Sequence, residues 1–164
     1  MKKSRLLSLL LCLVLATGLL TTFAAASSGS AILDEMDINA KAAILADPNT
    51  SEILYEKNAH EKMYPASITK VMTCLLTLEA IDRGELSLEQ VVTAGSGLHT
   101  GIGANASTAD IKAGEQIRII DLLYAALIPS ANEACNVMAE AVSGDVASFV
   151  ELMNQRAAEL GMTD

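Results

Sequence analysis

Ser67 and Lys70 are the first residues of this 164-residue sequence whose types and spacing could do chemistry together. They lie three residues apart, and helical residues at that spacing share one face. A serine hydroxyl is a weak nucleophile until a neighbouring base takes its proton. Lys70 is the only charged residue within residues 66–78, and burial among apolar residues disfavours a charged ammonium and suits a lysine to act as a base. The pair therefore predicts a serine nucleophile activated by lysine.

A purely structural explanation of the same pair is also open. Ser67 could be the N-cap of the helix, with Lys70 extending from the first turn to solvent. The helix is apolar nearly all round, which predicts that it is buried on every side.

Ser130 and Asn132 form a second candidate group. Pro129 ends one apolar helix, so both residues lie on a tight connection to the next helix, where polar side chains can be held rigidly. Acyl transfer needs a nucleophile, a base, a proton donor for the leaving amine and groups that hold the substrate amide. Ser130 could return the proton and Asn132 could bind the substrate backbone. Taken alone, Ser130 and Glu133 also fit a capping box.

The elements that must position these residues are two early strands followed mostly by helix, an α+β pattern. A hairpin is predicted over residues 42–56, with Asp47-Pro48-Asn49-Thr50 as its turn. A two-stranded hairpin alone is marginal in water. Helical patterns, one short strand and one long loop follow. The predicted helices are 67–82, 119–128, 132–142 and 146–160, the strand is 91–93 and the loop is 95–109.

The first 26 residues predict a secretory signal peptide, with a basic start, an apolar run and small residues before Ser27. An uncleaved membrane anchor is the alternative, because the apolar run is just long enough to span a bilayer. Residues 27–40 are expected to be a linker, and residues 41–164 a partial catalytic domain. The protein is therefore expected to be exported and to act outside the cytoplasm.

Charge and cysteine content narrow the class of partner. Loss of the leader removes three positive charges and takes the formal charge of −9 to −12. A surface that acidic argues against nucleic acid and anionic lipid as partners. The two remaining cysteines, Cys74 and Cys135, lie in apolar runs and are expected to be buried free thiols.

Ser67-Ile-Thr-Lys70 and Ser130-Ala-Asn132, behind a signal peptide, resemble the motifs of the low-molecular-mass penicillin-binding proteins. These are the serine D-Ala-D-Ala carboxypeptidases, the peptidase S11 family. Segments before and after both motifs match as well, so the resemblance covers about residues 40–164. It implies a β-lactamase/transpeptidase-like fold, of which this chain would hold the N-terminal hairpin and the helical part, with the remaining sheet strands missing.

By this resemblance Ser67 is the acyl-enzyme nucleophile, Lys70 the general base, Ser130 the proton relay and Asn132 a substrate-binding residue. The implied substrate is the D-Ala-D-Ala end of the peptidoglycan stem peptide, and β-lactam antibiotics would acylate the same serine. No metal or organic cofactor is implied. Attachment to the membrane surface is expected only through a C-terminal segment that this chain lacks.

The third motif of the family, Lys-Thr-Gly, is absent from the sequence. In the family it lies on a strand beyond the point where this chain stops, and that strand supplies one of two oxyanion-hole N–H groups. Loss of one such donor costs about 100- to 1000-fold in rate. We therefore expect that residues 27–164 alone neither fold stably nor hydrolyse D-Ala-D-Ala, and that the chain is a fragment.

Two other functions fit part of the pattern. A class A-like β-lactamase would share both motifs but would need a glutamate that activates the deacylating water, and Glu140, Glu151 and Glu159 lie in no pattern known for that role. A non-catalytic module that binds the cell wall or a partner protein would fit the absence of the third motif.

Overall fold

The computed structural model describes residues 38–162, and the chain divides after Lys62 into two compact units. The expected signal peptide, residues 1–26, and nearly all of the expected linker lie outside the described residues. Among the residues described, no helix combines the length and the apolar character needed to cross a bilayer.

The first unit contains the predicted hairpin. Strand β1 (Ala43–Ala46) pairs antiparallel with β2 (Ile53–Lys57), with an irregularity in register next to Ala46. The turn has the predicted chemistry, because Oδ1 of Asp47 accepts hydrogen bonds from the backbone N–H groups of Asn49 at 2.7 Å and Thr50 at 3.3 Å. Those bonds hold the pKa of Asp47 below its ordinary value.

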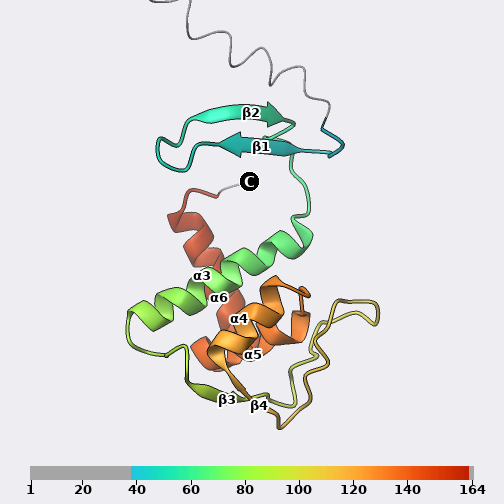
Figure 1. Ribbon diagram of the computed structural model, residues 1–164, viewed down its shortest axis with the longest axis vertical. Coiled ribbons are helices and arrows are strands. Elements are labelled where there is room, and N and C mark those ends of the chain that lie inside the picture. The colour runs from blue at the N-terminus through green and yellow to red at the C-terminus, as the bar shows by residue number, and fades with distance from the viewer. Residues whose placement is uncertain (1–37, 163–164) are drawn as a thin grey trace, which may run out of the picture. The chain divides into compact units, whose positions relative to one another are not determined.

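The second unit holds a short 3-10 turn, four helices and a second small sheet (Figure 1). In chain order these are η1 (Ala66–Ile68), α3 (Thr69–Asp82), β3 (Val91–Thr93), β4 (Gln116–Arg118), α4 (Ile119–Leu127), α5 (Asn132–Ser143) and α6 (Val146–Glu159). The predicted helices and the strand at 91–93 are confirmed to within a few residues. Gly84 follows α3 with a φ of +76°, as expected for a left-handed residue that ends a helix.

Strand β4 is the element that the sequence analysis missed. It pairs antiparallel with β3, and its register sets Val92 opposite Ile117. Both side chains are half-buried against the helical core. A three-residue strand leaves too little alternation for a periodic pattern to be recognised, and only its distant partner stabilises it.

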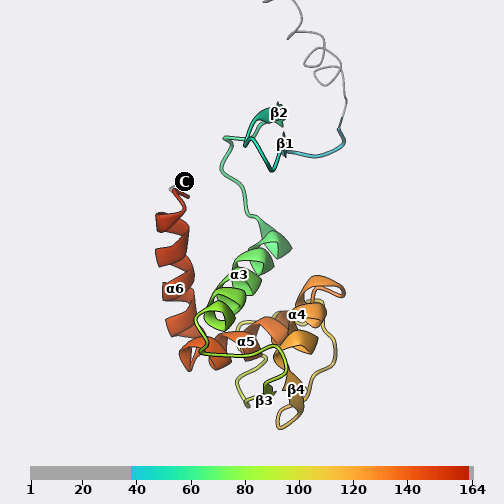
Figure 2. The same ribbon diagram turned by 60° about the vertical axis from the view of Figure 1, so that its left-hand side comes forward.

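Helix α5 occupies the centre of the second unit and packs against α3, α4 and α6 (Figures 1 and 2). Its apolar side faces two clusters of buried side chains. The larger cluster joins it to α3 and α4, and includes Ile119, Leu122 and Met138. The smaller joins it to α3 and α6 around Phe149. Because α5 begins at Asn132, this packing fixes the position of the second motif.

The expectation that α3 is buried on every side is wrong for the described part of the chain. Ile68, Val71 and Leu78 are 71%, 61% and 44% exposed, whereas Lys70 is only 8% exposed. Helices α4, α5 and α6 contact α3, but within the second unit they leave these apolar side chains exposed. Lys70 lies on the covered side.

Two leucines of α4 provide a matched test of this packing. Leu122 is fully buried and Leu127 is 57% exposed. Leu122→Ala should lower the free energy of unfolding by about 2–5 kcal/mol, because it leaves a cavity in the core. Leu127→Ala should change it by only about 0.5 kcal/mol. Urea unfolding of both variants measures this difference, and equal losses would contradict the placement of α4.

Candidate active site

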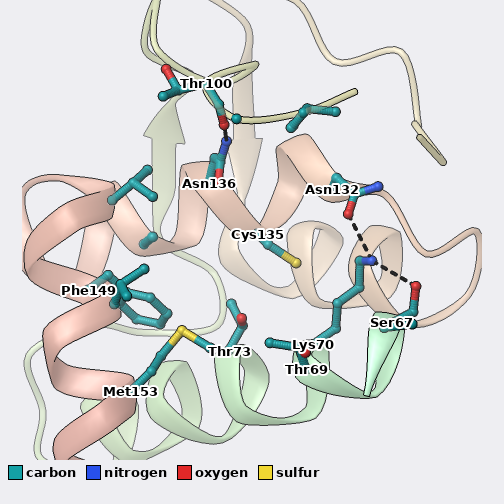
Figure 3. A pocket seen from close by; sticks show the side chains of 16 residues that line it. Ser67, Thr69, Lys70, Thr73, Thr100, Asn132, Cys135, Asn136, Phe149 and Met153 are labelled. Carbon is teal, nitrogen blue, oxygen red and sulfur yellow. Dashed lines mark hydrogen bonds between the residues drawn. The ribbon is translucent and has the colours of Figure 1, made fainter. Parts of the chain in front are cut away.

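A cavity of about 470 Å³ opens in the second unit between α3, α5, α6 and the loop that follows β3. Ser67, Lys70 and Asn132 line one end of it, and Phe149 and Met153 line the other (Figure 3). The two sequence motifs, more than sixty residues apart in the chain, therefore contribute to one site.

Lys70 joins the two motifs directly. Its Nζ donates to Oγ of Ser67 at 3.2 Å and to Oδ1 of Asn132 at 3.0 Å, and the three groups converge in Figure 3. The interpretation that Lys70 extends to solvent is thus wrong, since its amine turns inward across the helix pair. Lys70 makes no salt bridge with any residue from 38 to 162, so an amide and a hydroxyl, not a carboxylate, receive its hydrogen bonds.

The backbone before α3 directs Ser67 toward that amine. Ala66 has a φ of +48°, a left-handed conformation that is unfavourable for a residue with a Cβ. Ala66 is the first residue of the turn η1, and Ser67 lies inside that turn without capping a helix through its side chain. The N-cap explanation of Ser67 is therefore wrong as well. Backbone strain of this kind, which costs about 1–3 kcal/mol, is concentrated at functional sites.

Asn132 is held by a backbone carbonyl of the loop before β4. Its backbone N–H donates to the Ser107 carbonyl oxygen at 3.0 Å, and its Nδ2 donates to the same oxygen at 2.9 Å. With Nδ2 turned toward Ser107, Oδ1 is left to face Lys70. One carbonyl therefore selects which end of the amide enters the site.

Ser130 is not part of the cavity wall. It has a φ of +61° on the tight connection before α5, and it is absent from the residues that line the cavity. The capping box is wrong: the N-cap of α5 is Ala131, which makes no side-chain cap, and the Glu133 side chain turns into the core. The structure thus brings Ser67, Lys70 and Asn132 together in the cavity wall. Ser130, which precedes Asn132 by two residues, is outside that wall.

Sequence reasoning missed the loop that forms the third wall of the cavity. Thr100, Gly101 and Ile102 line it, and Nδ2 of Asn136 donates to the carbonyls of Leu98 at 2.9 Å and Thr100 at 3.0 Å. Asn136 follows Asn132 by one helical turn, a spacing that could have indicated a second polar residue on the same face. The loop itself has no periodic pattern that would connect it to the site.

The described chain resembles known proteins both in sequence and in fold. The family model for D-alanyl-D-alanine carboxypeptidases, Peptidase_S11, matches residues 27–164. D-alanyl-D-alanine carboxypeptidase DacF of Bacillus subtilis is 37% identical over 128 residues, which are 78% of this chain and 32% of that protein.

Two solved structures extend the likeness to the fold. PBP3 of Streptococcus pneumoniae, described as a peptidoglycan synthesis regulatory factor, superposes with a TM-score of 0.71 at 36% identity, over 79% of this chain and 36% of that one. Ampicillin-bound penicillin-binding protein D2 of Listeria monocytogenes superposes with a TM-score of 0.64 at 32% identity, over 79% of this chain and 50% of that one.

This chain belongs to the D-alanyl-D-alanine carboxypeptidase family.

The family membership confirms the resemblance that the two motifs predicted, and the neighbours confirm the β-lactamase/transpeptidase-like fold. The chain spans about a third of the length of the curated relatives it matches, 32% of DacF of Bacillus subtilis and 36% of DacC of Escherichia coli. The tripeptide His99-Thr100-Gly101 differs from the Lys-Thr-Gly of this family in its first residue and precedes the second motif, so we do not assign it that role.

Carboxylates are missing from the lining of this carboxypeptidase-family cavity. None of the described residues that form its wall is Asp or Glu. Of the three glutamates weighed for a β-lactamase, Glu140 lies against Gly95 and Gly97, Glu159 pairs with Arg156, and Glu151 is exposed. The described part of the site therefore offers no carboxylate to activate a deacylating water.

Cys135 lines the cavity beside Lys70 and, like Cys74, is a free thiol as expected. Cys74 is buried, but the expectation that Cys135 is buried as well is wrong, since it is only half-buried. Burial raises the pKa of Cys135 to about 11, although the positive charge of Lys70 acts in the opposite direction. A thiol whose pKa is higher in the folded state stabilises the fold below about pH 9, and this contribution is lost as the pH rises toward 11.

Alkylation measures this shift directly, because only the thiolate reacts. At pH 8, iodoacetamide should modify Cys135 about 100-fold more slowly than in the urea-unfolded chain, and the rate should keep rising up to about pH 11. Peptide-resolved mass spectrometry separates this thiol from Cys74. A rate that levels off near pH 9 would contradict the assigned environment.

Proposed function

We propose that the protein containing this chain is a serine D-Ala-D-Ala carboxypeptidase that removes the terminal D-Ala from peptidoglycan stem peptides. The observation that carries the proposal is the position of Lys70 Nζ, within hydrogen-bond distance of both Ser67 Oγ and Asn132 Oδ1 in one cavity. Membership of the carboxypeptidase family supports it.

The proposed reaction begins at Ser67. Its Oγ attacks the carbonyl carbon of the penultimate D-Ala while the Lys70 amine accepts the hydroxyl proton, for which the 3.2 Å separation is suitable. Cleavage of the peptide bond then requires a proton on the departing amine, and free D-Ala leaves. Water hydrolyses the resulting ester, which restores the Ser67 hydroxyl and releases the shortened stem peptide.

We assign supporting roles to the second motif. Asn132 would bind the substrate backbone, and its position beside Lys70 supports this assignment. Ser130 would relay the proton to the leaving amine; its left-handed backbone, two residues before Asn132, indicates that its place is specifically held.

β-Lactam antibiotics are the proposed inhibitors. The structure of the Listeria monocytogenes relative with ampicillin supports this proposal, since a serine that attacks an acyl-D-Ala-type amide can also open a β-lactam ring. We also propose that residues 1–26 direct export, that residues 41–164 belong to the catalytic domain, and that the protein acts on peptidoglycan outside the cytoplasm.

Acylation by a fluorescent penicillin tests the nucleophile and the base. In the full-length gene product, Ser67→Ala should abolish labelling, because no other group replaces the attacking oxygen. Lys70→Arg keeps hydrogen-bond donors at this position but removes a group that can accept a proton, and should slow labelling by about 100- to 10,000-fold.

Ser87→Ala is a matched control, since Ser87 is exposed and is not one of the residues that line the cavity. It should be labelled at the wild-type rate. Labelling of Ser67→Ala equal to wild type would exclude Ser67 as the nucleophile.

Product analysis distinguishes the proposed activity from its two rivals. A carboxypeptidase releases D-Ala from a peptide ending in D-Ala-D-Ala and turns penicillin over slowly. Rapid penicillin turnover without D-Ala release would favour a β-lactamase, whereas neither acylation nor D-Ala release would favour a non-catalytic binding module.

A further inference from the structure

Glu133 is a buried ionisable residue that the proposed reaction does not use. It follows Asn132 on α5 and is 0% exposed, in a unit whose other acidic side chains are at least partly exposed within the described residues. A buried carboxylate is costly unless it is hydrogen-bonded, so its contacts indicate what its burial accomplishes.

Those contacts all reach one short segment of the loop before β4. Oε1 of Glu133 accepts from Oγ1 of Thr108 at 2.5 Å, from the N–H of Ala109 at 2.7 Å and, more weakly, from the N–H of Ile111 at 3.5 Å. Oγ1 of Thr108 in turn accepts from the N–H of Asp110 at 2.9 Å. A single carboxylate oxygen thus fixes the backbone of residues 108–111.

The carboxylate form suits this arrangement. Burial acts to raise the pKa of Glu133, but the hydrogen bonds from Thr108, Ala109 and Ile111 outweigh it and hold the pKa below the ordinary value. Oε2 is buried without a hydrogen-bond partner among the described residues, so Glu133 bears a desolvation cost in order to hold this segment.

The segment held by Glu133 begins directly after the carbonyl that orients Asn132. Ser107 accepts from both nitrogens of Asn132, at 3.0 and 2.9 Å, and Thr108 is its covalent neighbour. The chain of contacts therefore runs from Glu133 through residues 107–109 to the Asn132 amide and from there to Lys70.

We propose that Glu133 is a positioning residue of the site: by fixing residues 107–109 it holds the Ser107 carbonyl where it turns Asn132 Oδ1 toward Lys70. The inference rests on the proposed function and adds a residue that touches neither Ser67 nor Lys70. Asn136 holds the other end of the same loop through the carbonyls of Leu98 and Thr100. Loss of Glu133 should therefore free only the end of the loop next to Asn132, residues 107–111.

A double-mutant cycle on penicillin acylation tests the route through Asn132. In the full-length gene product, Glu133→Leu removes the acceptor and should slow acylation by about 10- to 100-fold, as loss of a supporting residue does elsewhere. Glu133→Gln keeps an acceptor oxygen and should retain the rate within about tenfold. In an Asn132→Ala background, Glu133→Leu should change the rate by less than about twofold, because the residue it positions is gone.

Two controls separate positioning from general destabilisation. Leu122→Ala weakens the same fold without removing a hydrogen bond that holds the loop and, corrected for the folded fraction, should acylate at the wild-type rate. Hydrogen exchange of residues 107–111, followed by mass spectrometry, should accelerate by about tenfold or more in Glu133→Leu and stay near wild type in Glu133→Gln.

The outcomes distinguish this inference from the proposed function. If wild type is acylated and Ser67→Ala is not, multiplicative effects of Glu133→Leu and Asn132→Ala would overturn the positioning role and leave the carboxypeptidase intact. If neither wild type nor any variant is acylated, the proposed function fails. The hydrogen-exchange rates of residues 107–111 then decide by themselves whether Glu133 holds this segment. Unchanged exchange at residues 107–111 in Glu133→Leu then overturns the inference.

Discussion

The hydrogen bonds of one lysine amine connect the parts of this molecule that carry chemistry. Lys70 Nζ lies between Ser67 Oγ and Asn132 Oδ1, and these atoms come from the start of α3, the turn η1 before it and the start of α5. Without a carboxylate in the described cavity wall, the amine is not paired with an opposite charge. Its hydrogen bonds therefore go to the hydroxyl and the amide that face the cavity.

Both the apolar and the polar side of helix α5 help to position the Lys70 amine. Its apolar side packs against α3, α4 and α6 and sets the distance between the motifs. Its polar side holds the loop after β3 at two places, through Asn136 near residues 98–100 and through Asn132 and Glu133 near residues 107–111. A loop with little regular structure thereby becomes a defined wall, because side chains of a packed helix satisfy its backbone groups.

The two sides of α3 differ in their exposure within the second unit. Ile68, Val71 and Leu78 are exposed within the second unit. The side of α3 that bears Lys70, in contrast, is already enclosed by described residues.

The sequence by itself determined the two motifs, the hairpin and its turn, the helices and the family, since each rests on local chemistry or on a short pattern of residues. It also left Ser67, Lys70 and Glu133 with structural explanations that the fold overturned. Only the tertiary structure decided that Lys70 turns inward, that the Ser107 carbonyl selects the orientation of Asn132, and that Glu133 holds a loop rather than capping its own helix. These outcomes depend on contacts between residues some 25 to 62 positions apart, which no local periodicity encodes.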